Sequence, residues 1–190
     1  MHTRAHVLHF LEKVAYNTVL KRLTIRGGII LTEQSQSLIT DEMRKAIGVE
    51  SEPGVIEVEK ETIRRVADAL QDPNPLWRDE EYAKNTSWGG IVAFPIAFHP
   101  STRSGSTRAT FERPAGLRGG APVTDEWEFF EPIRPGDTIT TTTKILDFFQ
   151  REGRRGQMLF TVNEATYTNQ HGKVVMVQRR TGASFGPPKQ

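Results

Sequence analysis

Apolar residues recur at helical spacing in three segments of the first half of the chain. Residues 38–47 predict a short helix, because Thr40 is a suitable N-cap and Gly48 follows as a stop. Residues 62–70 predict a second helix, which the turn at Asp72-Pro73 ends. Its apolar face is formed by Ile63, Val66, Ala67 and Leu70. A third short helix is expected over residues 78–85.

In the second half of the chain, apolar and polar residues alternate in the way that is typical of strands. Strands are expected over residues 125–133, 138–152, 157–168 and 173–185. Turns that contain Gly, Pro or Asn separate them, and a shorter strand is expected earlier, over residues 55–59. Consecutive strands joined by short turns predict an antiparallel meander.

Two further segments have no clear periodicity. Residues 91–98 form a nearly unbroken apolar run, which fits a buried helix and a buried strand equally well. Residues 101–122 are rich in Gly, Ser, Thr, Pro and Arg, which predicts a long irregular loop. Loops of this length are usually functional or disordered.

Residues 1–36 differ in character from the rest of the chain and are expected to form a separate extension, helical or disordered. From Met1 to Thr32 the basic residues outnumber the single acidic one, Glu12, and apolar residues at three- and four-residue spacing favour a helix that Gly27 and Gly28 end. A docking arm, an unstructured extension, a transit peptide and a start codon assigned too early all fit this segment. Residues 37–186 are expected to form one domain and residues 187–190 a tail.

Composition narrows the classes of function. Lys and Arg number 25 and Asp and Glu 23, so the formal charge is +2, too small to indicate nucleic acid as the main partner. No apolar stretch approaches the roughly 18 residues of a membrane helix, so no membrane partner is expected. The absence of cysteine excludes disulfides, thiolate zinc sites and a cysteine nucleophile, and it fits a cytoplasmic protein. His2, His6 and His9 share a helical face, but no carboxylate or Cys accompanies them, so no metal site is expected.

Three motifs succeed one another along the chain. The first is the block Asp-Pro-Asn-Pro-Leu-Trp at residues 72–77, the second is Gly-Gly-Ile-Val-Ala at 89–93, and the third is Pro-Ile-Arg-Pro-Gly-Asp at 132–137. In order and spacing they resemble the MaoC-like hydratases and dehydratases, over residues 37–186. The resemblance implies an α+β hot-dog fold, in which an antiparallel sheet wraps around a central helix, and it implies that residues 91–98 begin that helix.

Catalytic members of this family use an Asp-x-Asn-Pro-x-His block as an acid and base pair, and a glycine N–H at the start of the central helix holds the thioester carbonyl. By the resemblance, Trp77 stands here in the place of the histidine and Pro95 in the place of the glycine. Trp cannot carry a proton at neutral pH, and proline has no N–H to donate. Asp72 therefore stays as a catalytic candidate without its partner. The chain resembles the N-terminal, non-catalytic type of MaoC-like domain.

The acyl thioester is expected to contact side chains of these motifs and of the loop after them. Apolar candidates for an acyl tunnel are Trp77, Trp88, Phe94, Ile96 and Phe98. Asn74 and Gly90 of the first two motifs are counted with them as substrate-binding. Arg103 and Arg108 in the loop could pair with the phosphates of coenzyme A or phosphopantetheine, although a solvated, mobile loop would have the same composition.

These observations predict a subunit that binds an acyl-CoA or acyl-carrier-protein thioester and pairs with a catalytic hot-dog subunit of an enoyl hydratase or 3-hydroxyacyl dehydratase. Two alternatives stay open. One is a non-enzymatic thioester-binding homodimer, and the other is a hot-dog thioesterase in which Asp72 activates water. No cofactor is expected.

Overall fold

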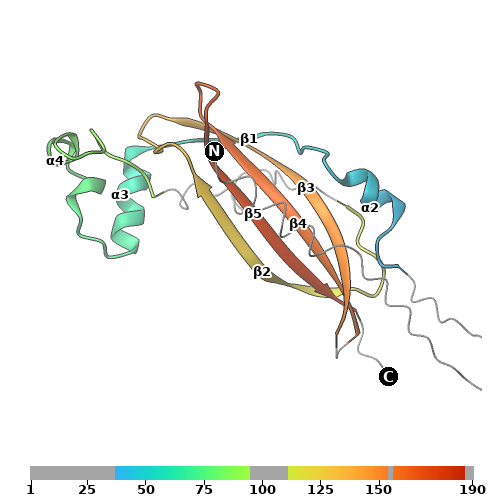
Figure 1. Ribbon diagram of the computed structural model, residues 1–190. Coiled ribbons are helices and arrows are strands. Elements are labelled where there is room, and N and C mark those ends of the chain that lie inside the picture. The colour runs from blue at the N-terminus through green and yellow to red at the C-terminus, as the bar shows by residue number, and fades with distance from the viewer. Residues whose placement is uncertain (1–36, 95–110, 154–155, 187–190) are drawn as a thin grey trace, which may run out of the picture. The chain divides into compact units, whose positions relative to one another are not determined.

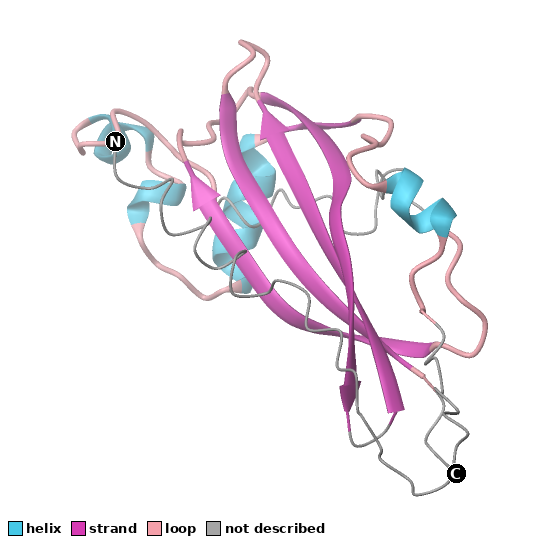
Figure 2. Cartoon of the chain, turned by 45° about the vertical axis from the view of Figure 1, so that its right-hand side comes forward, coloured by secondary structure: helices cyan, strands magenta, loops and turns pink. Residues whose placement is uncertain are grey.

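A computed structural model of the chain describes residues 37–94, 111–153 and 156–186. Within these residues five antiparallel strands lie in the order β1-β3-β4-β5-β2 (Figure 1). Their bounds are β1 Gly54–Glu57, β2 Arg118–Phe129, β3 Thr138–Gly153, β4 Gly156–Thr168 and β5 Val174–Phe185. Strands β3, β4 and β5 form a meander as predicted, but β2, which was expected to begin it, pairs with β5 at the opposite edge instead of with β3. The strands run side by side as one curled sheet (Figure 2), and the hot-dog fold class is confirmed.

Each of the three expected helices forms; the first and the third are shorter than predicted, and the second begins and ends earlier than predicted. They are α2 Asp41–Ala46, α3 Lys60–Ala69 and α4 Glu80–Lys84, and a 3-10 turn, η1 Pro75–Trp77, lies between the last two. Thr40 caps α2 as predicted, because its Oγ1 accepts the N–H of Met43 at 3.2 Å. Ile63 and Ala67 of α3 are buried, but Leu70 is 60% exposed, because it comes after the last turn of the helix.

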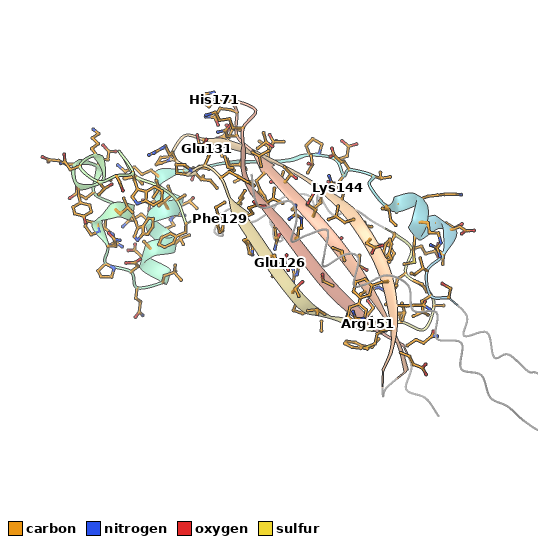
Figure 3. The ribbon with its side chains drawn as sticks, in the orientation of Figure 1. Glu126, Phe129, Glu131, Lys144, Arg151 and His171 are labelled. Carbon is orange, nitrogen blue, oxygen red and sulfur yellow. The ribbon has the colours of Figure 1, made fainter. Side chains whose placement is uncertain are left out.

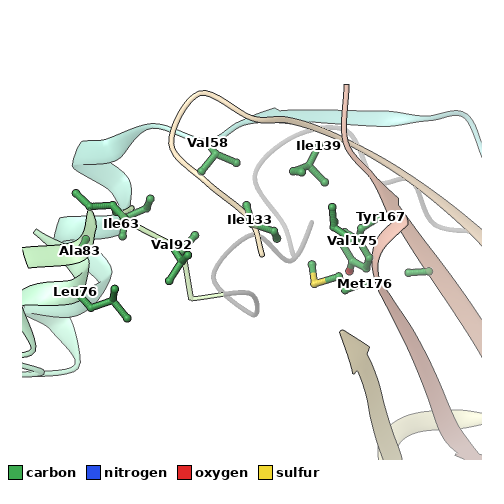
Figure 4. Close-up of a cluster of buried hydrophobic side chains, with 13 residues drawn as sticks. Val58, Ile63, Leu76, Ala83, Val92, Ile133, Ile139, Tyr167, Val175 and Met176 are labelled. Atoms are coloured by element: carbon green, nitrogen blue, oxygen red, sulfur yellow. The ribbon is translucent and has the colours of Figure 1, made fainter. Parts of the chain in front are cut away.

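Two clusters of buried apolar side chains hold the described elements together. The first joins the segment from β1 to residue 93 to one end of the sheet (Figure 4). Its members are Val58, Ile63, Leu76, Ala83, Ile91, Val92, Ala93, Ile133, Ile139, Ala165, Tyr167, Val175 and Met176. The second joins α2 to the same face of the sheet further along β3 and β4, through Met43, Ile145, Phe148 and Leu159.

The two edges of the sheet differ. The outer edge of β3 is covered, first by β1 and then by residues 47–51, where the N–H groups of Gly48 and Ser51 donate to the carbonyls of Ile145 and Thr143, each at 2.8 Å. In the described part of the chain, no strand pairs with the outer edge of β2. Exposed apolar residues lie on and just beyond this strand: Val123, Phe129 and Phe130.

Three predicted boundaries are wrong. Residues 91–94 do not start a helix but form a buried irregular segment, and Ala93 donates its N–H to the carbonyl of Ile133 at 2.8 Å instead of to a helical turn. The loop predicted over residues 101–122 ends before residue 122, because β2 begins at Arg118. Strand β2 tolerates Pro122 because it is an edge strand with register shifts. The strand expected over residues 125–133 leaves the sheet after Phe129.

Candidate functional site

The turn at residues 72–77 is held by a chain of side-chain caps. Asp72 Oδ1 accepts the backbone N–H of Asn74 at 2.9 Å, and Asn74 Oδ1 accepts the N–H of Leu76 at 3.0 Å. Both are Asx-type bonds, which explains why Asp and Asn stand two residues apart before the prolines. Leu76 is buried in the first core cluster and so fixes the turn to the domain.

Trp77 is joined to Asp72 and to Phe94. Its indole Nε1–H donates to Asp72 Oδ2 at 2.9 Å, and its ring lies on the ring of Phe94 with centroids 4.0 Å apart and planes tilted by 32°. Trp77, which the resemblance puts at the position of the catalytic histidine, thus contacts Asp72 of the same block. It acts as a hydrogen-bond donor only, because an indole has no acceptor nitrogen.

The electrostatics of the turn favour an ionised Asp72. The hydrogen bond from the Asn74 backbone lowers the pKa of this carboxyl group most, and the bond from Trp77 and the charge of Arg78 lower it further. Arg78 also donates from Nη2 to the Asp72 carbonyl at 2.8 Å and lies 3.2 Å from an Asp68 carboxylate oxygen. Each carboxylate oxygen thus accepts one hydrogen bond, and these bonds favour the ionised form of Asp72.

Trp88 and Gly90 are held by Arg134, which was not among the predicted site residues. Its Nη2 donates to the carbonyl of Trp88 at 2.6 Å, and a Cβ at Gly90 would lie 3.3 Å from its Nη1. Arg134 belongs to the third motif, Pro-Ile-Arg-Pro-Gly-Asp, which is the signal that could have found it. The guanidinium thus connects Trp88, the residue before the second motif, to the third motif, while the Trp88 side chain is 48% exposed.

The structure therefore brings Asp72, Asn74, Trp77 and Phe94 together, and it places Trp88 and Gly90 beside Arg134. The remaining predicted contacts lie outside the described residues. They are Pro95, Ile96, Phe98, Arg103 and Arg108, together with the greater part of the expected central helix.

A pair of buried hydroxyl groups on the core face of the sheet was also missed. Thr141 and Tyr167 stand directly opposite each other in β3 and β4, both are fully buried, and neither hydroxyl has a hydrogen-bond partner among the described residues. In the next row the buried Gln178 donates from Nε2 to Asp125 Oδ1 at 2.6 Å. The alternation of apolar and polar residues predicts on which face of the sheet these residues lie. It does not predict whether their hydroxyl groups find hydrogen-bond partners.

Other kinds of site are not found among the described residues. They contain no cluster of three or more His, Cys, Asp or Glu placed to bind a metal ion. No helix among them has both the length and the apolar character needed to cross a membrane.

Comparison with known proteins identifies the family. Residues 45–178 match the family described as FAS1-like, dehydratase domain region. The MaoC-like dehydratase from Rhodospirillum rubrum is similar in structure, with a TM-score of 0.57 and 25% sequence identity over 76% of this chain and 95% of that one. The chain belongs to the MaoC-like hot-dog dehydratases. This MaoC-like protein also shares its fold with HadBC, a 3R-hydroxyacyl-ACP dehydratase complex from Mycobacterium tuberculosis, with a TM-score of 0.55 and 22% identity over 77% of this chain and 99% of that chain.

This MaoC-like protein is also similar in amino-acid sequence to two further proteins. The UPF0336 protein of Thermobifida fusca is 32% identical over 125 residues, which are 63% of this chain and 79% of that protein. The probable enoyl-CoA hydratase alpha subunit of Thermomonospora curvata is 26% identical over 142 residues, which are 67% of this chain and 44% of that protein. Proteins similar to this chain thus include one that is named as the alpha subunit of a probable enoyl-CoA hydratase.

Proposed function

We propose that this MaoC-like protein is the acyl-thioester-binding subunit of an enoyl hydratase or 3-hydroxyacyl dehydratase, and that a second hot-dog subunit supplies the catalytic Asp and His. One observation carries the proposal. Both carboxylate oxygens of Asp72 accept hydrogen bonds, and the group that bonds Oδ2 is the indole of Trp77, at the position where the catalytic block has its histidine.

Hydration of an enoyl thioester needs a base that activates water, an acid for the alpha carbon, and donors on the carbonyl oxygen. Asp72 has a lowered pKa, and Trp77 can neither accept nor relay a proton. Losing one such acid or base typically slows a reaction about 10²- to 10⁴-fold. The thioesterase alternative would use the ionised Asp72 as the base that activates water, and the test below separates it from the proposal.

What this subunit contributes is an aromatic wall for the acyl group. Trp77 packs against the first core cluster and on Phe94, so two rings are fixed beside the turn of the first motif. When an acyl chain packs on these rings, little side-chain entropy of the protein is lost, because the positions of the two rings are already fixed before binding. Either carrier fits this role, since the similar proteins are named for acyl-CoA and for acyl-carrier-protein substrates.

The test compares the isolated protein with a mixture. Enoyl-CoA hydration should be undetectable with this chain alone and should appear when a hot-dog subunit with an intact Asp-x-Asn-Pro-x-His block is added. Asp72→Asn in this chain should leave the activity of the mixture within a few-fold, whereas replacing the histidine of the added subunit should abolish it. Asp79→Asn is the matched control, because Asp79 caps α4 at an exposed position and Asn caps equally well. Hydration or thioester hydrolysis by the isolated protein that disappears with Asp72→Asn would refute the proposal.

A further inference from the structure

The turn that follows α4 is held by hydrogen bonds and presents an exposed tryptophan ring. Thr86 Oγ1 donates to the carbonyl of Ala83 at 2.7 Å, and it accepts the backbone N–H of Trp88 at 3.2 Å. The N–H of Gly89 donates to the Thr86 carbonyl at 3.0 Å and closes the turn. These bonds use only the backbone of Trp88, and its side chain is 48% exposed. The turn therefore offers an aromatic surface on a fixed backbone.

Arg134 brings a positive charge to this turn. Its Nη2 donates to the carbonyl of Trp88 at 2.6 Å, and a Cβ at Gly90 would lie 3.3 Å from its Nη1. Glycine at position 90 thus keeps the space beside the guanidinium free of a side chain. Within the part of the chain that the structure describes, no carboxylate forms an ion pair with Arg134. An arginine has five N–H donors, and the bond to Trp88 uses one of them.

The guanidinium and the turn that it holds lie at the end of the sheet where the third motif meets the turn between β4 and β5. Gln170 Nε2 of that turn donates to Asp137 Oδ1 of the motif at 3.0 Å. Figure 3 shows Glu131, the residue just before the motif, and His171 at this end of the sheet, and it shows Arg151 at the other end. Residues near Arg151 are therefore distant from the exposed tryptophan and can serve as controls.

We propose that Trp88 and Arg134 bind the phosphoadenosine end of coenzyme A, with the adenine stacked on the indole and a phosphate paired with the guanidinium. The proposal rests on the proposed function, and it names the carrier of the acyl group. Adenine has a flat face that stacks on an aromatic side chain. Arg pairs with phosphate oxygens through two parallel N–H groups, and here no described carboxylate competes for them.

The exposure of Trp88 fits a nucleotide better than an acyl chain. An acyl chain gains most from surfaces that are buried away from water, such as the paired rings of Trp77 and Phe94. Phosphopantetheine on a carrier protein has one phosphate and no base, so it would leave the indole of Trp88 unused. An aromatic surface beside a cation therefore matches coenzyme A.

Adenosine 3′,5′-bisphosphate, the end group of coenzyme A, is the first probe, and its dissociation constant from the full chain is measured by NMR titration. Trp88→Ala should weaken its binding about 5- to 100-fold, as expected for the loss of one stacked base, and Trp88→Phe should restore binding to within a few-fold. Adenosine without phosphates should bind at least about tenfold more weakly than the bisphosphate. Arg134→Lys can still donate to the Trp88 carbonyl, so it should weaken binding of the bisphosphate and leave that of adenosine unchanged.

Phe185→Ala is the matched control. Phe185 is also an exposed aromatic residue, at 38%, but it lies at the far end of β5, in the row of Met158 and Arg151. Its removal should not change binding. Trp88→Ala should keep the melting temperature, because the bonds that hold the turn involve only backbone groups of Trp88. The comparison of adenosine with the bisphosphate uses the unaltered protein, so it decides the question even if a variant unfolds.

Whole thioesters distinguish coenzyme A from a free nucleotide. An acyl-CoA should bind at least about tenfold more tightly than the same acyl group on pantetheine, and Trp88→Ala should remove most of that difference. Equal binding of the two thioesters would overturn the proposal, and ADP that bound tightly in that case would identify a site for free nucleotides. Absence of bisphosphate binding, or binding that Trp88→Ala leaves unchanged, would overturn it as well. If hydration still appears with a catalytic subunit after such a result, the proposed function stands and only the assignment of the carrier falls.

Discussion

Replacing Tyr167 by Phe should stabilise the protein, although Tyr167 is a fully buried core residue. Within the part of the chain that the structure describes, its hydroxyl has no hydrogen-bond partner, and the hydroxyl of Thr141 on the neighbouring strand has none either. A buried polar group without a partner costs about 1–3 kcal/mol relative to a paired one. Removing the oxygen leaves a gap of one atom, which costs about 0.3 kcal/mol at the usual penalty per volume.

The net gain is therefore about 0.7–2.7 kcal/mol for Tyr167→Phe. For a chain of 150–250 residues, 1 kcal/mol moves the melting temperature by about 2–4 °C, so an increase of roughly 1–11 °C is expected. Thr141→Val should act in the same direction and leaves no gap, because a methyl group replaces the hydroxyl. If the two hydroxyls are independent, the double variant should gain the sum of the two within about 0.5 kcal/mol.

Differential scanning calorimetry of the full chain and the three variants measures these shifts. Tyr82→Phe is the control, because Tyr82 is 48% exposed and its hydroxyl is free to meet water; its melting temperature should not change. A loss of several degrees with Tyr167→Phe would refute the reasoning, since it would mean that the hydroxyl has a partner in solution. A double variant that is more stable than the sum of the two single changes would also contradict it, since it would mean that the two hydroxyls share a hydrogen bond or a partner.

Other predictions concern titration, the core and the extension. Burial raises the pKa of Tyr167 above its ordinary 10, so stability that is present below pH 10 should fall as the pH rises further, and Tyr167→Phe should remove that fall in melting temperature. The lowered pKa of Asp72 gives stability that is present above pH 3.8 and lost as the pH falls; with Trp77→Phe, the Asp72 carboxyl pKa measured by NMR should rise toward 3.8. Ile139→Ala removes a fully buried side chain and should lower the free energy of unfolding by about 2–5 kcal/mol in urea titrations; a smaller loss would mean that the site collapses around the gap. A chain that starts at Ser37 should keep its melting temperature, and a drop of several degrees would show that residues 1–36 pack on the domain.

The sequence predicted strands well where their two faces differ strongly. The bounds of β4 match the prediction to within one residue. Apolar and polar residues alternate in this strand, and a turn follows directly after its last residue, Thr168. Strand β2 was predicted to begin seven residues too late, at Asp125 instead of Arg118, because Gly119, Gly120 and Pro122 are typical of loops. An edge strand forms backbone hydrogen bonds on one side only, so it can contain a proline whose missing N–H would face outward. Local composition does not show which strand lies at an edge.

For the candidate site, the sequence supplied the residues but not their contacts. The motif named Asp72 and Trp77, yet only the folded turn shows that the indole points its N–H at the carboxylate. The bond between Arg134 and Trp88 joins residues 46 positions apart, and no local pattern predicts such a pair. The roles assigned to Arg103 and Arg108 stay predictions, because both lie outside the described residues.

The unequal edges of the sheet limit how far this protein can polymerise. At one side β1 has only four residues, and residues 47–51 cover the next stretch of β3, so little backbone is left to template a further strand. Growth by strand addition therefore has one direction, and it ends once β2 has acquired a neighbour. A substitution that detached residues 47–51 from β3 would expose unpaired backbone groups at a second edge of the sheet. Strands could then be added at both edges, so that copies of the protein could associate into fibres instead of stopping at a closed complex.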